Sequence, residues 1–416
     1  MTEDNPQYHL PDVLEGTDHY FAAGGLLEQT CRDAGLNFEQ RPQQLKMARA
    51  VAEACTYPYH LAVEAGTGVG KSFAYLIPLI LSALKKNIRV VVATYTINLQ
   101  EQLVHKDIPF VKKSLGLDFK ALLVKGRSNY VCLRRLRRAE KMGSDLFQRS
   151  RESEVQRIRT WLESTNDGSI QEMPELPSPE VWSAVCAENG NCLGRRCSHY
   201  DACYLMHARK QMAEANVLVV NHHLFFSELA LRANGSSFLP DYGVVVFDEA
   251  HQMENVASSH MGIRLSYYAW QDWFRRLYIP ADNKGLVAVM KDGEAAQMVV
   301  QLSEAVEDFY ARIKQYYKLG PGKAQQRLFS APEIETAIPE RMNRLLVRIG
   351  LMKHNTENED LQAELDSVRN KGLFLQEQFE NFLGQSLENH VYWVAAEGRR
   401  SVAVLYSAPI DVGPLL

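Results

Sequence analysis

Long apolar runs are missing from this sequence. The longest run near its glycine-rich loop extends from Ala74 to Leu84 and is interrupted by Pro78, whereas a membrane-spanning helix needs roughly twenty apolar residues. The N-terminal residues MTEDNPQYHLPDVLEG are acidic and have neither the basic start nor the apolar centre of a secretory signal. We therefore expect no transmembrane helix and a cytoplasmic protein.

Cysteine is also scarce, and the charge is nearly balanced. Seven cysteines among 416 residues exclude a small disulfide-stabilised secreted domain. The formal net charge of −4 argues against a chain that binds nucleic acid over its whole surface, although local basic patches can still do so. With 46% hydrophobic and 23% charged residues, the chain is expected to fold into two to four domains.

Three of the 25 glycines lie in one short loop, AGTGVGKS, which fits the phosphate-binding pattern with an alanine at its first position. In such a loop, backbone N–H groups surround a polyphosphate, the lysine reaches the β and γ phosphates, and the serine hydroxyl binds Mg²⁺. The flanking runs HLAVEA and SFAYLIPLILSAL predict a buried strand and a helix. The predicted nucleotide-binding residues here are Ala65, Gly66, Thr67, Gly68, Val69, Gly70, Lys71 and Ser72.

A second motif, YGVVVFDEAHQM, ends a β-branched run in two acidic residues. Ligands gather at the carboxyl ends of strands in an open parallel sheet, so Asp248 is expected to face the loop and bind Mg²⁺, while Glu249 polarises the attacking water. Seen alone, the loop could be a simple turn and the acidic pair an ordinary strand end. Together they predict a nucleotide-binding α/β core, to which RVVVATYTINLQEQL and ANVLVVNHHLFF contribute further strands.

The cysteines are clustered. Four of the seven lie between positions 186 and 203, and Cys132 precedes them in the basic stretch KGRSNYVCLRRLRR. This grouping indicates metal ligands rather than scattered core residues. Zinc is an alternative occupant, although the distance from Cys132 to the other cysteines is unlike a compact zinc ribbon.

The order of these motifs resembles the DinG branch of the XPD-like iron-sulfur helicases, within helicase superfamily 2. The resemblance rests on the phosphate loop, Asp-Glu-Ala-His, and the run CLGRRCSHYDACYLMHARKQMAEANVLVVNHHLFF, and it extends from about residue 20 to the end. It implies that four thiolates bind one [4Fe-4S] cluster and that Cys31, Cys55 and Cys186 are ordinary residues; the alternative for Cys186 is that it replaces one of the ligands. The implied cluster ligands are Cys132, Cys192, Cys197 and Cys203.

The same resemblance assigns further roles. Arg41 and Gln44, which lie on one face if helical, correspond to the adenine-side motif, and ATYTINLQEQL corresponds to a DNA-contacting motif. His251 is expected to couple the ATP site to the rest of the motor. The basic residues from Lys125 to Lys141, with Tyr130 among them, fit single-stranded DNA, although a solvated basic helix is the alternative.

The resemblance also implies an architecture: a RecA-like parallel-sheet core with an inserted iron-sulfur domain and an inserted helical arch. We expect the core at residues 1–120 and 209–264, the iron-sulfur domain at 121–208, the arch at 265–388, and a return to the core at 389–416. In the arch, Val299, Leu302, Val306, Phe309 and Ile313 share one helix face, and Leu361, Leu365 and Val368 belong to a second helical stretch. The sequence stops before a second motor domain, so a truncated chain with poor unwinding is expected.

The leading hypothesis is therefore an ATP-dependent 5′–3′ DNA helicase, monomeric, acting on single-stranded and tailed or forked duplex DNA in repair or replication. Lys71, Ser72, Asp248 and Glu249 carry ATP hydrolysis in this hypothesis. The alternative from another class is a redox-sensitive single-strand-binding module with a regulatory nucleotide site. A different phosphate-loop enzyme, such as a kinase, has no support beyond the loop.

Overall fold

The computed structural model describes residues 11–57, 59–141, 152–233, 235–320, 324–398 and 401–413. The remaining positions, which include the outer ends of the expected domains 1–120 and 389–416, lie outside the described residues. The chain divides into two compact units, one formed by Met1–Lys125 and Ala208–Val256 and the other by Gly126–His207 and Ala257–Leu416. The expected segment 121–208 thus begins and ends close to two of these divisions, but it shares a unit with the expected arch.

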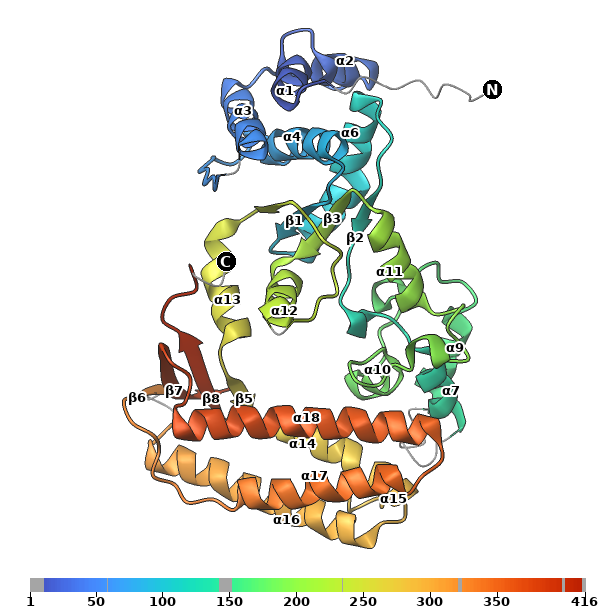
Figure 1. Cartoon of the computed structure of the whole chain (residues 1–416), viewed down its shortest axis with the longest axis vertical. Helices are drawn as coiled ribbons and strands as arrows, with labels where there is room; N and C mark the ends of the chain where they lie inside the picture. The colour runs from blue at the N-terminus through green and yellow to red at the C-terminus, as the bar shows by residue number, and fades with distance from the viewer. Residues whose placement is uncertain are drawn as a thin grey trace. The chain divides into compact units, whose positions relative to one another are not determined.

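The first unit is built on a four-stranded parallel sheet of order β2-β3-β1-β4 (Figure 1). Its strands are β1 (Val90–Thr94), β2 (Ala121–Leu123), β3 (Val217–Asn221) and β4 (Val244–Phe247). Alternate residues of β1 pack into different apolar clusters on the two faces, Val92 into one and Val91 into the other. Both faces of the central strands are covered, as expected for a parallel sheet, so the predicted α/β core is confirmed.

Helices surround this sheet. They are α1 (Val13–Phe21), α2 (Leu26–Asp33), α3 (Pro42–Thr56), α4 (Lys71–Lys86), α5 (Ile97–Gln102), α6 (Ile108–Leu115) and α12 (His222–Ala233), while α11 (Tyr204–Glu214) and α13 (Met253–Met261) run across the unit boundaries. The predicted helix after the glycine-rich loop is α4, and Pro78 lies inside it. Ten consecutive residues of α4 are buried, which explains why apolar packing outweighs the backbone hydrogen bond that the proline removes.

The strand predicted from HLAVEA is absent: residues 59–66 form no regular element, and Leu61 and Val63 are exposed. A strand needs a ladder partner, and this short apolar run could not specify one by itself. Strand β4 forms its ladder with β1 and is one of the two edge strands of the sheet, with β2 at the other edge, in the described part of the chain.

The second unit combines long helices with an antiparallel sheet of order β5-β8-β7-β6. Its strands are β5 (Arg264–Ser266), β6 (Gln325–Leu328), β7 (His390–Glu397) and β8 (Val402–Pro409). Its helices are α7 (Leu133–Lys141), α9 (Glu152–Trp161), α10 (Pro179–Val185), α14 (Tyr267–Leu277), α15 (Leu286–Val289), α16 (Gly293–Tyr316), α17 (Ile338–His354) and α18 (Glu359–Gly384).

The helical stripe predicted for α16 is confirmed, since all five residues from Val299 to Ile313 are buried in one large cluster. Leu365 and Val368 of α18 are buried in the same cluster, and Leu361 packs against it. The expected return of 389–416 to the first core is wrong. Strands β7 and β8 instead pair with β5 and β6, and Val394 and Leu405 complete the apolar core of the second unit. Periodicity identified both strands, but it could not identify their partners.

No helix in the described ranges has the length and apolar character needed to cross a bilayer.

Candidate nucleotide site and cysteine set

The glycine-rich loop ends where α4 begins. Gly68 and Gly70 have φ values of 80° and 84°, a left-handed conformation that favours glycine. Gly70 is the N-cap of α4, so Lys71 and Ser72 occupy the first turn of the helix, whose free N–H groups and positive dipole end favour an anion. The loop therefore has the local geometry of a phosphate site.

Helix α3 holds this loop through two side chains. The Nη1 atom of Arg41 donates to the carbonyl oxygen of Gly68 at 2.6 Å, and Nε2 of Gln44 donates to the carbonyl oxygen of Gly70 at 2.9 Å. A Cβ atom built on Gly70 would lie 2.2 Å from Nε2 of Gln44. Both residues predicted for the adenine side thus contact the backbone of the loop, and a side chain at position 70 would displace the amide of Gln44.

The acidic motif at the end of β4 lies close to the glycine-rich loop within the first unit. The Nζ atom of Lys71 lies 3.5 Å from Oε1 of Glu249, and the two side chains are each about one-third exposed. Glu249 has a φ of 56°, which turns it away from the line of β4 and toward α4. The Nδ1 atom of His251 lies 3.5 Å from the other oxygen of Glu249. Three of the predicted residues are therefore in one cluster, with Glu249 at its centre.

Asp248 is held from three directions. Its backbone N–H donates to the carbonyl of Ala93 on β1 at 2.8 Å, which places it at the carboxyl end of the sheet. The hydroxyl of Tyr75 on α4 donates to Oδ2 at 3.2 Å, and the N–H of Glu249 donates to Oδ1 at 3.0 Å. Burial and the neighbouring Asp248 carboxylate raise the pKa of Tyr75 well above its usual range, so Tyr75 stays a neutral donor.

Sequence reasoning missed Tyr75 and His222. Nε2 of His222 donates to the carbonyls of Asp248 at 2.9 Å and Ala93 at 3.3 Å, so this buried ring joins the ends of β1 and β4. Burial lowers the pKa of His222, which keeps the ring neutral. His222 directly follows β3, and a polar residue at a strand's carboxyl end is the signal that could have identified it.

A further carboxylate lies near the loop. Asp107 is buried at the end of η1 (Leu103–Asp107), a π-helical turn between α5 and α6. Burial raises the pKa of Asp107, and hydrogen bonds from Gln102 and Ser72 oppose this rise. The predicted magnesium ligand Ser72 is thus close to a second acidic residue that the sequence motifs did not identify.

In the second unit, all four predicted cluster ligands are free thiols on short connecting segments. Cys132 and Cys203 directly precede α7 and α11, and their carbonyls accept the first helical hydrogen bonds from Leu136 and His207. The sulfur of Cys192 accepts from the backbone N–H of Gly194 at 3.4 Å, on η5 (Gly194–Arg196). Helix N-termini and N–H donors favour thiolates, whereas burial raises the pKa of Cys132 and Cys203 and opposes this effect.

The thiols influence one another electrostatically. Burial is the main cause of the raised pKa of Cys203, and the neighbouring Cys192 and Cys197 raise this pKa further. Burial also raises the pKa of Cys132, and Cys203 contributes to that rise. Among the described residues, no three Cys, His, Asp or Glu side chains are close enough to hold a single metal ion. Because a [4Fe-4S] cluster binds each thiolate through a different iron, its ligands need not converge on one point. Four thiolates are the donor set that a [4Fe-4S] cluster takes, and four-cysteine zinc sites use the same donors.

Cys186 belongs to a different environment. Its sulfur lies 3.9 Å from the carbonyl oxygen of Ser183, and its own carbonyl accepts from Nη1 of Arg135 at 2.5 Å. Cys31 and Cys55 are buried in the apolar core of the first unit.

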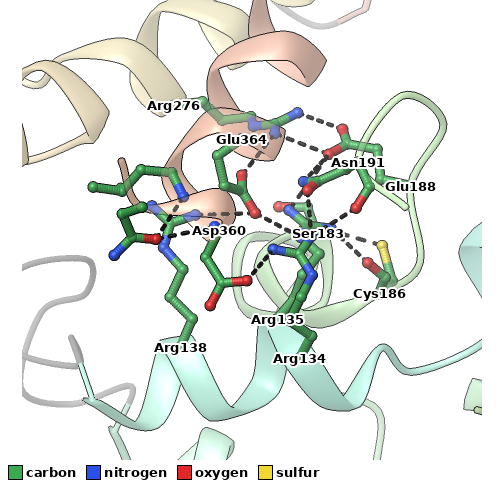
Figure 2. A network of polar contacts seen from close by, with 12 residues as sticks. Arg134, Arg135, Arg138, Ser183, Cys186, Glu188, Asn191, Arg276, Asp360 and Glu364 are labelled. Carbon is green, nitrogen blue, oxygen red and sulfur yellow. Dashed lines mark hydrogen bonds and ion pairs between the residues drawn. The ribbon is translucent and has the colours of Figure 1, made fainter. Parts of the chain in front are cut away.

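The basic stretch differs from the prediction. Arg134 and Arg135 are only 5% and 3% exposed, and Arg138 is 11% exposed, because all three form ion pairs with acidic residues of α18 (Figure 2). Tyr130 is 4% exposed, and burial raises its pKa to about 12. These four residues are not available to DNA in this structure. A run of positive charge in the sequence could not reveal acidic partners more than two hundred positions away.

Comparison with known proteins agrees with the geometry of the first unit. A DEAD/DEAH box helicase model matches residues 41–146, which include the glycine-rich loop and both side chains of α3 that hold it. The chain is 38% identical over 248 residues to "ATP-dependent DNA helicase YoaA" of Haemophilus influenzae, covering 59% of this chain and 37% of that protein. It is 36% identical over 275 residues to the protein of the same name in Escherichia coli, covering 65% and 42%.

A third relative carries the name inferred from the motifs. The chain is 35% identical over 243 residues to "ATP-dependent helicase DinG" of Mycobacterium tuberculosis, covering 54% of this chain and 36% of that protein. Over these matched segments the chain is similar to DinG-type helicases. It spans about two fifths of the length of these relatives.

Proposed function

We propose that this DinG-type chain binds and hydrolyses ATP as part of a DNA helicase. The observation that carries the proposal is the approach of Lys71 to Glu249, which joins the first turn of α4 to the acidic end of β4. The loop N–H groups and Lys71 would bind the phosphates, with Arg41 and Gln44 beside them. Ser72 and Asp248 would hold Mg²⁺, which neutralises phosphate charge when bound.

The residues of the chain would catalyse hydrolysis by positioning the water and by stabilising charge on the phosphates. Glu249 orients and polarises the attacking water, and Lys71 stabilises negative charge that develops on the transferred phosphoryl group. His251, beside Glu249, is suited to report the state of this site to the rest of the motor. Tyr75 and His222 are positioning residues, because Tyr75 donates to the carboxylate of Asp248 and His222 donates to its backbone carbonyl.

We further propose that Cys132, Cys192, Cys197 and Cys203 bind one [4Fe-4S] cluster. The observations that support it are the free thiols, the N–H donor to Cys192 and the helix starts after Cys132 and Cys203. Iron, acid-labile sulfide and zinc should be measured in anaerobically purified protein and in Cys192→Ser. About four iron and four sulfide per chain, lost in the variant, are expected; zinc without sulfide would overturn the assignment.

For the whole helicase we propose single-stranded DNA as the track and tailed or forked duplex DNA as the substrate, with 5′–3′ movement and a role in repair. The names of the relatives support DNA as the substrate. The test is ATP hydrolysis by the purified chain with and without single-stranded DNA. DNA-stimulated turnover is expected, whereas DNA binding that ignores ATP, with no turnover, would favour a binding module instead.

A further inference from the structure

A buried polar network, here called the arginine network, joins the segment of the cysteine set to the long helix α18. Its members are Arg134, Arg135, Arg138, Glu188, Asn191, Arg276, Asp360 and Glu364, all within the second unit (Figure 2). Three of the arginines lie on one face of α7, and two of the acidic residues lie one turn apart on α18.

Glu364 is the central acceptor of the network. Its carboxylate lies 3.1 Å from Nε of Arg135, 3.0 Å from Nη1 of Arg138 and 3.4 Å from Nη2 of Arg276. Its side chain is only 8% exposed, and the charges of the three arginines outweigh burial and lower its pKa to about 2. Arg276 also forms a bidentate pair with Glu188, so α14 is tied into the same network. The ionised carboxylate of α18 is thus a shared counter-charge for arginines of two other helices, α7 and α14.

Arg134 connects α18 directly to a predicted cluster ligand. Its Nη1 atom donates to Oδ1 of Asp360 at 2.9 Å, while Nη2 donates to the carbonyl oxygen and the side-chain oxygen of Asn191, at 2.6 Å and 2.5 Å. Asn191 directly precedes Cys192 in the chain. One guanidinium group therefore fixes both the backbone that leads to Cys192 and the first turn of α18.

The N-terminal end of α7 also adjoins a second predicted ligand. Cys132 directly precedes α7, and its backbone N–H donates to the carbonyl of Val185 at 2.8 Å. Arg135, one turn into the helix, donates to the carbonyl of Cys186 and pairs with Glu364. The same helix that carries the arginines thus sets the position of Cys132 relative to the 185–192 segment.

We propose that the arginine network couples the occupancy of the cysteine set to the docking of α18. Binding of the cluster fixes Cys132 and Cys192 in the arrangement in which Arg134 and Arg135 reach Asp360 and Glu364. Loss of the cluster frees α7 and the 185–192 segment, and α18 loses part of its anchorage. Because such coupling is reciprocal, weakening the α18 contacts also weakens retention of the cluster. The inference rests on the proposed cluster.

The first experiment measures cluster retention without changing a cysteine. Glu364→Gln removes the central charge, Asp360→Asn removes only the half-exposed pair with Arg134, and Glu377→Gln makes the same charge change at an exposed position of α18. The rate of iron release to a chelator should rise severalfold in Asp360→Asn and more in Glu364→Gln, and stay at the wild-type value in Glu377→Gln. Equal rates in all four proteins would overturn the coupling.

The second experiment measures the reverse direction. Hydrogen exchange of peptides covering residues 359–372 should be faster in Cys192→Ser than in the cluster-loaded protein, while peptides of α4 in the other unit remain unchanged. Unchanged exchange in α18 would overturn the proposal, and so would uniform acceleration along the whole chain, which would indicate general destabilisation. If the wild-type protein binds no iron, the proposed cluster itself fails; if iron is bound but neither readout moves, only the coupling fails.

Discussion

The ammonium nitrogen of Lys71 lies 3.5 Å from a carboxylate oxygen of Glu249, although the two residues are 178 positions apart in the sequence. Parallel strands bring their carboxyl ends to one edge of the sheet, and α4 begins beside that edge. The pair is one-third exposed, so it remains accessible to a ligand. A phosphate entering the loop would compete with Glu249 for Lys71, which would leave the carboxylate available for water.

Lys71→Ala is expected to lose nucleotide affinity and DNA-stimulated ATP hydrolysis, because the loop keeps its shape but loses its mobile positive charge. Turnover should fall by at least 100-fold, about 3 kcal/mol in transition-state stabilisation. Phosphate release measured at saturating ATP and DNA provides the check. Lys113→Ala, an exposed lysine of α6, is the matched control. If Lys71→Ala hydrolysed ATP at the wild-type rate, this loop could not be the site of ATP hydrolysis.

Glu249→Gln should separate binding from chemistry. The amide retains the size of the side chain but cannot polarise water as a carboxylate does, so hydrolysis should fall roughly 10²- to 10⁴-fold. Nucleotide affinity should stay the same or rise, because Lys71 no longer has a competing anion. A fluorescent ATP analogue measures the affinity, and single-turnover hydrolysis measures the chemical step. A parallel loss of affinity and rate would instead assign Glu249 to structure.

Much of the first unit could be predicted because its signals are local. The glycine-rich loop, the helix that follows it and the apolar runs of β1, β3 and β4 each lie within a few consecutive residues. The errors concern partners that are distant in sequence. Nothing near HLAVEA specifies a ladder, and nothing near Arg135 indicates that Glu364 will neutralise it. Tyr75 was hidden in an apolar helix run, where a phenol is usually a core residue.

Gly70→Ala tests the fit between α3 and the loop. Alanine at a φ of 84° costs about 1–2 kcal/mol, and its Cβ would displace the Gln44 amide that now holds the Gly70 carbonyl. We expect nucleotide affinity to fall about tenfold or more. Gly116→Ala is the control, since Gly116 follows α6, has a φ of 62° and a Cβ there meets nothing within 4 Å. Isothermal titration with a non-hydrolysable ATP analogue measures the affinity of Gly70→Ala and of the control variant. Equal affinities of these two variants would show that the close approach of Gln44 is unimportant for nucleotide binding.

The arginine network predicts that the free energy of unfolding depends on pH through the titration of one residue, Glu364. The folded-state pKa of Glu364 is lowered from 4.5 to about 2, so its ionised form stabilises the fold fully above about pH 4.5, and this contribution is lost as the pH falls toward 2. A shift of this size corresponds to about 3 kcal/mol. Glu364→Gln cannot titrate and leaves three guanidinium groups without their shared carboxylate, so it should be less stable than the wild type at pH 7 by about 3–5 kcal/mol.

The difference in unfolding free energy between wild type and Glu364→Gln should therefore shrink as the pH is lowered from 5 to 3. Urea unfolding of both proteins at several pH values measures it, with Glu377→Gln as the exposed control whose difference from wild type stays small throughout. A gap between wild type and Glu364→Gln that is constant with pH would mean that Glu364 is not held ionised by the arginines. Because the network lies wholly within the second unit, the effect should appear in the unfolding of that unit, while nucleotide binding by the first unit is unaffected.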